Sequence, residues 1–236
     1  MNIIKYGGSK VRPTEESYDD QFINSLINLV KKYSNEMFMI IIGGGALARK
    51  KQREEPQADQ DRKDWLGIEA TWENANYVIK RFQQTGVKSV YPEVIKDPTK
   101  KIEGYKIYFA GGWKPGWSTD YVTMRLAQTY QAEKVIKISD FKIVKDFSPL
   151  KVKDMSKEER DKVLAEAEDL PKATWKKMVE LVGTKWVPGL NTPLDPIAAK
   201  LGLENPYITI YICRELELSK VLSDNLDTFV GTIVTG

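Results

Sequence analysis

The chain has 236 residues, 42% of them hydrophobic and 29% charged, which is enough for one large α/β domain or two small lobes around a core. Its formal net charge of +3 is small, and its basic residues are interleaved with acids, so charge gives no argument for a nucleic-acid partner. Histidine is absent, which excludes Ser-His-Asp and Cys-His catalysis, histidine general bases and histidine-ligated zinc.

Three further features bear on the compartment. No apolar run approaches the roughly 18 residues of a membrane-spanning helix. The N-terminus resembles an immediate β-strand and not a signal peptide. The single Cys213 lies in an apolar run, and one cysteine fits a reducing cytosol. We therefore expect a cytoplasmic protein with no membrane partner.

The first half of the chain alternates short apolar runs with amphipathic segments. Strands are expected at residues 2–6, 37–42, 87–91 and 105–109. Helices are expected at 18–33, from about 46, at 64–83 and at 119–131. The buried stripe of the helix at 64–83 is expected to be Ile68, Thr71, Ala75, Val78, Ile79 and Phe82. Residues 52–63 are polar and have no apolar stripe, so an irregular surface excursion is expected there.

The second half continues the alternation. Strands are expected at 135–138, 207–213 and 229–234. Ser156 and Glu159 form a capping-box pattern that opens a charged helix to about residue 168. The next helix carries a stripe of Trp175, Met178, Val179 and Val182. Asp195 is expected to cap a helix that starts with Pro196 and stops at Gly202.

This order of elements predicts an α/β protein, a three-layer αβα sandwich with a central, mostly parallel sheet. We find no internal repeat and no clean linker, so residues 1–236 are expected to form a single domain. Ligands of such folds bind outside the carboxyl ends of the strands.

Three glycine-rich stretches each follow an apolar run and precede an expected helix. They are Lys5-Tyr-Gly-Gly-Ser9, Ile42-Gly-Gly-Gly-Ala-Leu-Ala-Arg49 and Gly111-Gly-Trp-Lys-Pro-Gly-Trp-Ser-Thr-Asp120. Glycine permits sharp turns that aim backbone N–H groups at an anion, and a helix N-terminus favours negative charge. Neither a Walker A loop nor the Rossmann glycine spacing is present. The stretches predict a site that holds several phosphates.

Each stretch also has a simpler interpretation. The first is compatible with a tight turn beside a solvated lysine, and Asp120 is compatible with a plain first-turn acid of a helix that Ser118 or Thr119 caps. Trp113 and Trp117 flank the third stretch, where they either pack in the core or contact a ligand.

These motifs, in this order, resemble those of the amino acid kinase superfamily, and within it the archaeal-type uridylate (UMP) kinases. The resemblance covers nearly the whole chain. Besides the three stretches, it rests on 64–68 (Asp-Trp-Leu-Gly-Ile), 74–76 (Asn-Ala-Asn), 194–200 (Leu-Asp-Pro-Ile-Ala-Ala-Lys) and 231–232 (Gly-Thr). It implies transfer of the γ-phosphoryl group of ATP to UMP, which gives UDP for pyrimidine nucleotide biosynthesis.

The resemblance also implies residue roles. Catalytic roles fall on Lys5, which would neutralise the transferring phosphoryl group, and on Asp120 and Asp195, which would organise the centre or its Mg²⁺. UMP would be bound by Gly44, Gly45, Arg49, Asp64, Gly112, Ser118 and Thr119. ATP would be bound by Gly7, Gly8, Ser9, Ser139, Asp140, Val144 and Asp146. No separate metal ligand is assigned, because Mg²⁺ would arrive on the ATP phosphates.

The two halves match the family unequally. Residues 1–133 are expected to bind UMP and residues 134–236 the nucleotide donor. In the donor half, segment 138–149 departs from the family pattern, with Lys142 in place of a glycine and Val144 in place of a tyrosine. Two alternatives therefore stay open: another small phosphate or carboxylate acceptor, or a nucleotide-binding or storage module without turnover. The partners implied are UMP, ATP and copies of this chain in a hexamer, a trimer of dimers.

Overall fold

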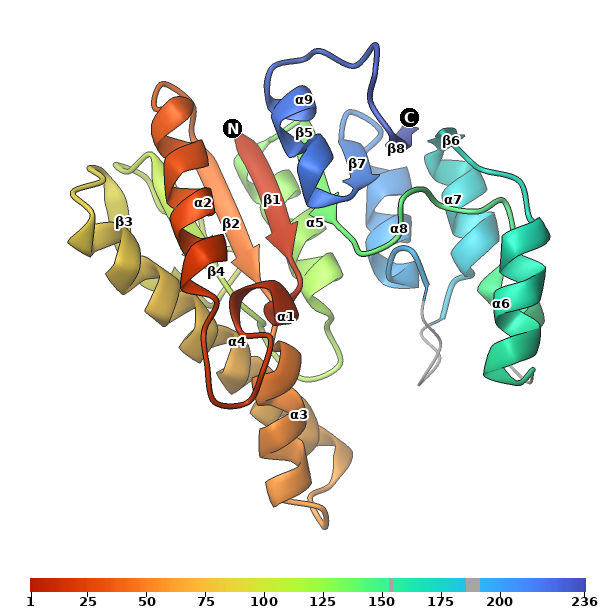
Figure 1. The fold of residues 1–236 in the computed structure, drawn as a ribbon, viewed down its shortest axis with the longest axis horizontal. Helices are drawn as coiled ribbons and strands as arrows, with labels where there is room; N and C mark the ends of the chain where they lie inside the picture. The colour runs from red at the N-terminus through yellow and green to blue at the C-terminus, as the bar shows by residue number, and fades with distance from the viewer. Residues whose placement is uncertain (153–154, 186–191) are drawn as a thin grey trace. The chain divides into compact units, whose positions relative to one another are not determined.

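This computed structural model describes residues 1–152, 155–185 and 192–236 (Figure 1). The chain divides into two compact units, unit 1 from Met1 to Ala132 and unit 2 from Glu133 to Gly236. Each unit contains both strands and helices.

The strands of unit 1 are all parallel and pair in the order β3-β4-β2-β1. Their bounds are β1 (Asn2–Tyr6), β2 (Phe38–Ile42), β3 (Val90–Ile95) and β4 (Ile107–Ala110). All five residues of β2 are buried, which requires cover on both faces of the strand.

Unit 1 also contains helices. They are α1 (Gly8–Val11), α2 (Asp20–Lys32), α3 (Gly45–Glu54), α4 (Gln60–Gln84) and α5 (Thr119–Tyr130). The six positions predicted for the buried stripe of α4 are all buried. Helix α4 contacts β2, β3 and β4, and α5 contacts β1 and β2.

The predicted excursion at 52–63 is wrong in extent. Helix α3 continues to Glu54, and α4 already begins at Gln60, where the Asp59 side chain accepts a hydrogen bond from the Arg62 amide at 2.8 Å. Arg62 also pairs with Glu55. These ends need no apolar stripe, because capping and charge pairing stabilise helices that project into solvent.

The predicted strand at 87–91 is displaced along the chain. Ser89 has a φ of 62°, which an extended strand does not tolerate, so β3 starts at Val90. The strand then runs through Pro92, which lacks an N–H donor. Because β3 pairs only with β4 within unit 1, Pro92 sits where the missing donor costs least.

Unit 2 contains β5 (Lys134–Ile138), β6 (Lys172–Thr174), β7 (Thr209–Cys213) and β8 (Gly231–Thr235), in the order β5-β7-β8-β6. Among these named strands, β7 and β8 pair in antiparallel fashion, whereas β5 with β7 and β6 with β8 are parallel. Its helices are α6 (Lys157–Glu166), α7 (Trp175–Val182), α8 (Pro196–Glu204) and α9 (Leu218–Leu222), with 3-10 turns at Pro149–Val152 and Glu215–Glu217. The sequence did not predict β6.

Local signals in unit 2 hold with two exceptions, of which the first is the buried stripe of α7, where Leu181 is buried and the predicted Val179 is only half-buried. The capping box at Ser156 and Glu159 is present. Gly202, however, does not stop α8, which continues to Glu204. A Cβ atom at Gly202 would lie 2.5 Å from the Trp175 ring, so this glycine allows α7 and α8 to pack closely.

The predicted α/β class, with mostly parallel strands and helical cover, is confirmed. Among the helices that the structure describes, none combines the length and apolarity needed to cross a membrane.

Candidate active site

The three glycine loops of unit 1 follow parallel strands. Loop 1 (residues 7–9) follows β1, loop 2 (43–45) follows β2, and loop 3 (111–118) follows β4. Because these strands run in the same direction, their carboxyl ends lie at one edge of the sheet. All three loops therefore lie at that edge.

Loops 1 and 2 touch through their backbones. A Cβ atom at Gly8 would lie 2.3 Å from the Gly43 carbonyl oxygen, and one at Gly45 would lie 2.5 Å from the Ser9 nitrogen. Gly45 also has a φ of 57°. Only glycine permits this approach and this conformation, so the glycines bring two potential anion cradles into contact.

Helix α3 begins in loop 2 with Gly44 as its N-cap residue, and no side chain caps it within the described part of the chain. Its first amides therefore retain hydrogen-bonding capacity for an anion. Arg49, one turn further along, is exposed, and no residue that the structure describes forms an ion pair or hydrogen bond with its guanidinium group. An uncommitted arginine beside an uncapped helix N-terminus is suited to binding a phosphate.

Helix α4 holds loop 3. The Gly112 amide donates to Thr71 Oγ1 at 2.6 Å, and the Trp72 indole Nε1–H donates to the Gly112 carbonyl at 2.7 Å. The Thr71 hydroxyl in turn donates to the Ile68 carbonyl at 2.6 Å. Both backbone polar groups of Gly112 are thus fixed by side chains of one helix.

Asp64, near the start of α4, also binds loop 3. Its Oδ2 accepts from the Gly116 amide and its Oδ1 from the Gln60 side chain, each at 2.8 Å. In loop 3 itself, the Ser118 hydroxyl caps α5 by accepting from the Tyr121 amide at 3.1 Å. Asp64 and Ser118 therefore have structural partners, and any contact with UMP would add to these bonds.

Asn74 binds loop 2 from the same helix. It is fully buried, and its Nδ2 donates to the carbonyl oxygens of Gly43 at 3.0 Å and Gly44 at 3.2 Å. Its Oδ1 is buried without a partner among the described residues. Helix α4 thus positions loops 2 and 3 together.

Lys5 and Asp120 form an ion pair in this region. Lys5 Nζ lies 3.2 Å from Asp120 Oδ1, and the two side chains are only 15% and 11% exposed. Lys5 lies in β1, one residue before its end, and Asp120 in the first turn of α5. Removal from water strengthens the pairing, which restrains the ammonium group beside loop 1.

Aromatic side chains cover loop 3. The rings of Trp117 and Tyr121 lie 4.0 Å apart, those of Trp113 and Trp117 lie 5.8 Å apart, and Lys114 Nζ is 4.0 Å from the Trp113 ring. Trp113 and Trp117 therefore pack on each other, and both remain partly exposed.

The unit 2 residues have separate structural roles. Asp195 caps α8, with Oδ1 accepting from the amides of Ile197 at 2.8 Å and Ala198 at 3.0 Å. The Ser139 hydroxyl donates to the Phe141 carbonyl at 3.0 Å, and Asp146 pairs with Lys177 at 2.6 Å.

Two further residues of segment 138–149 differ in exposure. Val144 is 3% exposed, its amide donates to Thr232 Oγ1 at 3.0 Å and its carbonyl accepts from the Leu170 amide at 2.8 Å. Asp140 is exposed. The side chain and backbone of Val144 are thus already engaged inside unit 2.

Within the described ranges, no group of three or more Asp, Glu, Cys or His residues could hold a metal ion.

Sequence reasoning missed the positioning residues of α4. Thr71 was assigned only to the apolar stripe, and Asn74 only to a family motif. A signal was present, because Asn74 lies three residues after Thr71 and one before Ala75 on a buried helical face. A buried amide needs hydrogen-bond partners, and the nearest backbone outside the helix is that of the glycine loops.

The fold and loops together define an α/β protein with three glycine-rich loops at the carboxyl ends of parallel strands. The model of the amino acid kinase family matches residues 1–213, and the chain belongs to this family.

Similar proteins agree with this assignment. A uridylate kinase of Pyrococcus abyssi is 29% identical over 220 residues, which are 90% of each chain. One of Staphylothermus marinus is 30% identical over 220 residues, 89% of this chain and 87% of the relative. The crystal structure of uridylate kinase from Archaeoglobus fulgidus superposes with a TM-score of 0.75 at 21% identity over 99% of both chains, which confirms the predicted fold.

Proposed function

We propose that this protein is a UMP kinase that transfers the γ-phosphoryl group of ATP to UMP and forms UDP and ADP. The observation that carries the proposal is the backbone contact between loops 1 and 2, with Lys5 of the preceding strand beside them. A phosphoryl transfer needs two anionic groups held close together and a cation to neutralise the charge that develops between them. The similarity to uridylate kinases over about 90% of the chain supports UMP as the acceptor.

The roles in unit 1 follow from its contacts. The amides at Gly44 and Gly45, with Arg49, are proposed to bind the phosphate of UMP, and Thr119 at the start of α5 to assist them. Gly112, Ser118 and Asp64 are proposed to form the rest of the UMP site, through loop 3.

The transfer requires no general base. A phosphate monoester has a second pKa of about 6, so UMP is largely a dianion at neutral pH and its oxygen is already a nucleophile. That oxygen attacks the γ-phosphorus, the bond to the β-phosphate breaks, and ADP leaves with the electron pair. Lys5, restrained by Asp120, stabilises the charge on the transferring group. The absence of histidine is compatible with this chemistry.

The donor assignment rests on fewer contacts. Gly7, Gly8 and Ser9 are proposed to bind the ATP phosphates, and Ser139, Asp140, Val144 and Asp146 the rest of the nucleotide. Mg²⁺ is proposed to accompany ATP and to neutralise its phosphates, with Asp120 and Asp195 as the acids that organise the centre. A hexamer in the cytoplasm is the expected assembly and location, and light scattering after size-exclusion chromatography tests the assembly.

An ADP-release assay tests the function. The protein is supplied with Mg²⁺ and ATP, and UMP, CMP, AMP and isopentenyl phosphate are compared as acceptors. We expect turnover to be fastest with UMP. Faster turnover with another acceptor would replace UMP in the proposal, and tight UMP binding without turnover on any acceptor would instead support a binding module.

Arg49→Ala tests the phosphate assignment. We expect kcat/KM for UMP to fall by about 2–3 kcal/mol in transition-state stabilisation, because a charge-assisted contact is lost. Arg53→Ala is a matched control, since Arg53 lies on the same helix but pairs with Glu15. Equal kinetics of the two variants would refute the role of Arg49.

A further inference from the structure

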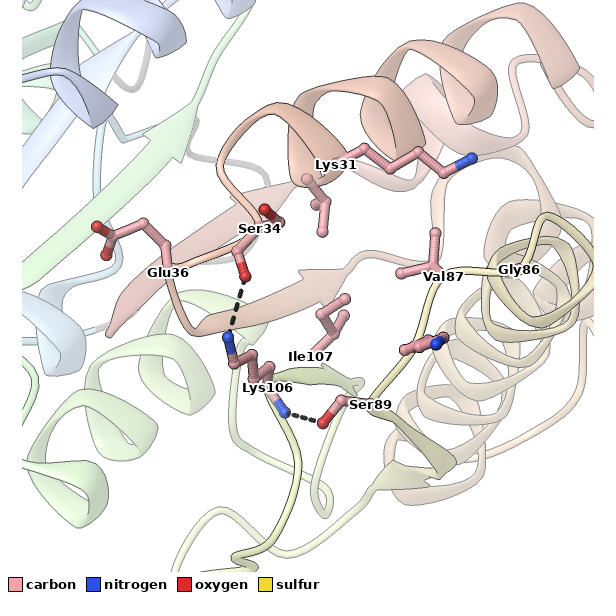
Figure 2. A pocket seen from close by; sticks show the side chains of 10 residues that line it. Lys31, Ser34, Glu36, Gly86, Val87, Ser89, Lys106 and Ile107 are labelled. Carbon is pink, nitrogen blue, oxygen red and sulfur yellow. Dashed lines mark hydrogen bonds between the residues drawn. The ribbon is translucent and has the colours of Figure 1, made fainter.

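A cavity of about 330 Å³ lies in unit 1, away from the glycine loops (Figure 2). Its walls come from the end of α2, from residues 86–89 after α4, and from residues 106–107 where β4 begins. Loop 3 follows the opposite end of β4, so the cavity lies at the amino end of that strand. No residue proposed to bind UMP or ATP lines it.

Positive charge predominates around the cavity. Lys31, Lys88 and Lys106 line it, against the single acid Glu36. Among the residues described, none of these lysines has a carboxylate partner: Lys31 Nζ donates to the Thr85 carbonyl and Lys106 Nζ to the Ser34 carbonyl, each at 3.2 Å. An ammonium group has three donors, so each retains donors and an uncompensated charge.

The acid does not offset these lysines closely. Glu36 Oε2 accepts from the Asn2 side chain at 3.4 Å, and Figure 2 shows its carboxylate directed away from Lys106. The cavity therefore presents a net positive surface to a small ligand.

One wall is built from strained but well-bonded backbone. Ser89 has a left-handed φ of 62°, and its carbonyl accepts from the amides of Lys106 and Ile107, each at 3.0 Å. Its hydroxyl accepts a further bond from the Lys106 amide at 2.9 Å (Figure 2). Strain of this kind persists where the surroundings enforce it, and it is typical of ligand sites. The wall that carries Lys88 and Lys106 is thus preformed.

The interior of the cavity is apolar. Val30, Val87 and Ile107 contribute side chains to its lining. A cavity with an apolar interior and a few converging polar groups is the usual form of a small-molecule site.

We propose that this cavity binds a small organic anion, with a phosphate or carboxylate head on the lysines and an apolar body against Val30, Val87 and Ile107. The charge selects the head, and the apolar lining selects the body. This site is independent of UMP turnover, because none of its residues belongs to the proposed centre.

Two-dimensional NMR of the ¹⁵N-labelled full chain tests the site with four probes: phenyl phosphate, benzoate, inorganic phosphate and phenol. We expect the amides of Gly86, Ser89 and Ile107 to shift with at least one of the two aromatic anions, and more weakly with inorganic phosphate and phenol. Comparison of phenyl phosphate with benzoate identifies the preferred head. The proposal is overturned if these amides respond to neither aromatic anion at millimolar concentration, or respond equally to phenol.

Variants test the role of charge. In Lys88→Gln/Lys106→Gln we expect the Kd of the better anion to rise about fivefold to tenfold, since two exposed charges that line the cavity are lost. Lys80→Gln/Lys176→Gln removes the same charge from exposed positions outside the cavity and should leave Kd unchanged. Lys88→Gln alone should raise Kd by a smaller factor, and because Lys88 is exposed, this single variant tests the proposal even if the double variant does not fold. An unchanged Kd in Lys88→Gln, or equal effects of the two double variants, would overturn it.

Discussion

Replacing Asn74 with alanine removes the contact between α4 and loop 2. The Nδ2 group of Asn74 bonds the carbonyls of both Gly43 and Gly44, and the side chain is fully buried. Each such bond contributes about 1 kcal/mol net, and a carbonyl left buried without a partner costs a further 1–3 kcal/mol or so. The partnerless Oδ1 of Asn74 is removed as well, which offsets part of this cost. We expect the free energy of unfolding to fall by about 1–3 kcal/mol.

The kinetic effect should exceed the effect on stability. Loop 2 carries the amides proposed to bind the phosphate of UMP, and a displacement of about 1 Å in a reacting group costs up to roughly a hundredfold in rate. We expect kcat/KM for UMP to fall by about tenfold to a hundredfold, with KM for ATP nearly unchanged. Steady-state kinetics with each substrate varied in turn, beside urea unfolding, separate the two effects.

Two further variants make the Asn74 prediction sharper. Asn74→Asp should be worse than Asn74→Ala, because it places a buried carboxylate opposite two carbonyl oxygens. Asn76→Ala is the control, since Asn76 lies on the same helix but is exposed. If Asn74→Ala and Asn76→Ala have equal kinetics, Asn74 does not position the loop.

Three other predictions concern packing and ionisation. Gly8→Ala should unfold at markedly lower urea concentration, because its Cβ atom would lie 2.3 Å from the Gly43 carbonyl oxygen; an unchanged midpoint would show that the loops do not touch. Gly202→Ala should likewise destabilise unit 2, because its Cβ atom would lie 2.5 Å from the Trp175 ring. Alanine has the higher helix propensity, so a gain in thermal stability would contradict this packing. Burial raises the pKa of the Cys213 thiol to about 12, so alkylation at pH 8 should require unfolding. Because the folded pKa exceeds the unfolded one, the protonated thiol stabilises the fold below about pH 8.5, and this contribution is lost as pH rises toward 12. Cys213→Ala should abolish that part of the fall in the free energy of unfolding at alkaline pH, measured by urea titration.

Much of the fold could be predicted from local patterns. The burial of α4 follows from apolar residues at helical spacing, and the caps at Asp59, Ser156 and Asp195 are set by neighbours within three residues. One error arose where a backbone conformation overrode side-chain preference. Val87 favours a strand, but the left-handed turn at Ser89 shifts β3 toward Ile95.

The candidate site was likewise predicted in part from the sequence and completed by the structure. Glycine composition and alternating elements placed three anion-binding loops at one edge of the sheet, and the lack of histidine restricted the chemistry to positioning and charge. The structure then added the contact of Gly8 with loop 2 and the pairing of Lys5 with Asp120, residues 115 positions apart. The roles assigned to individual residues stay predictions for the kinetic tests above.

The sequence by itself thus determined the class of fold, the edge of the sheet that carries the glycine loops and the kind of chemistry proposed there, because these depend on periodicity, composition and short-range turns. Only the tertiary structure decided which groups meet: Asn74 with the carbonyls of loop 2, Asp64 with the Gly116 amide, and three lysines around a cavity at the far end of β4. Such contacts join segments that lie tens of residues apart, and they form only when the packing of α4 and the strands fixes the distances between them.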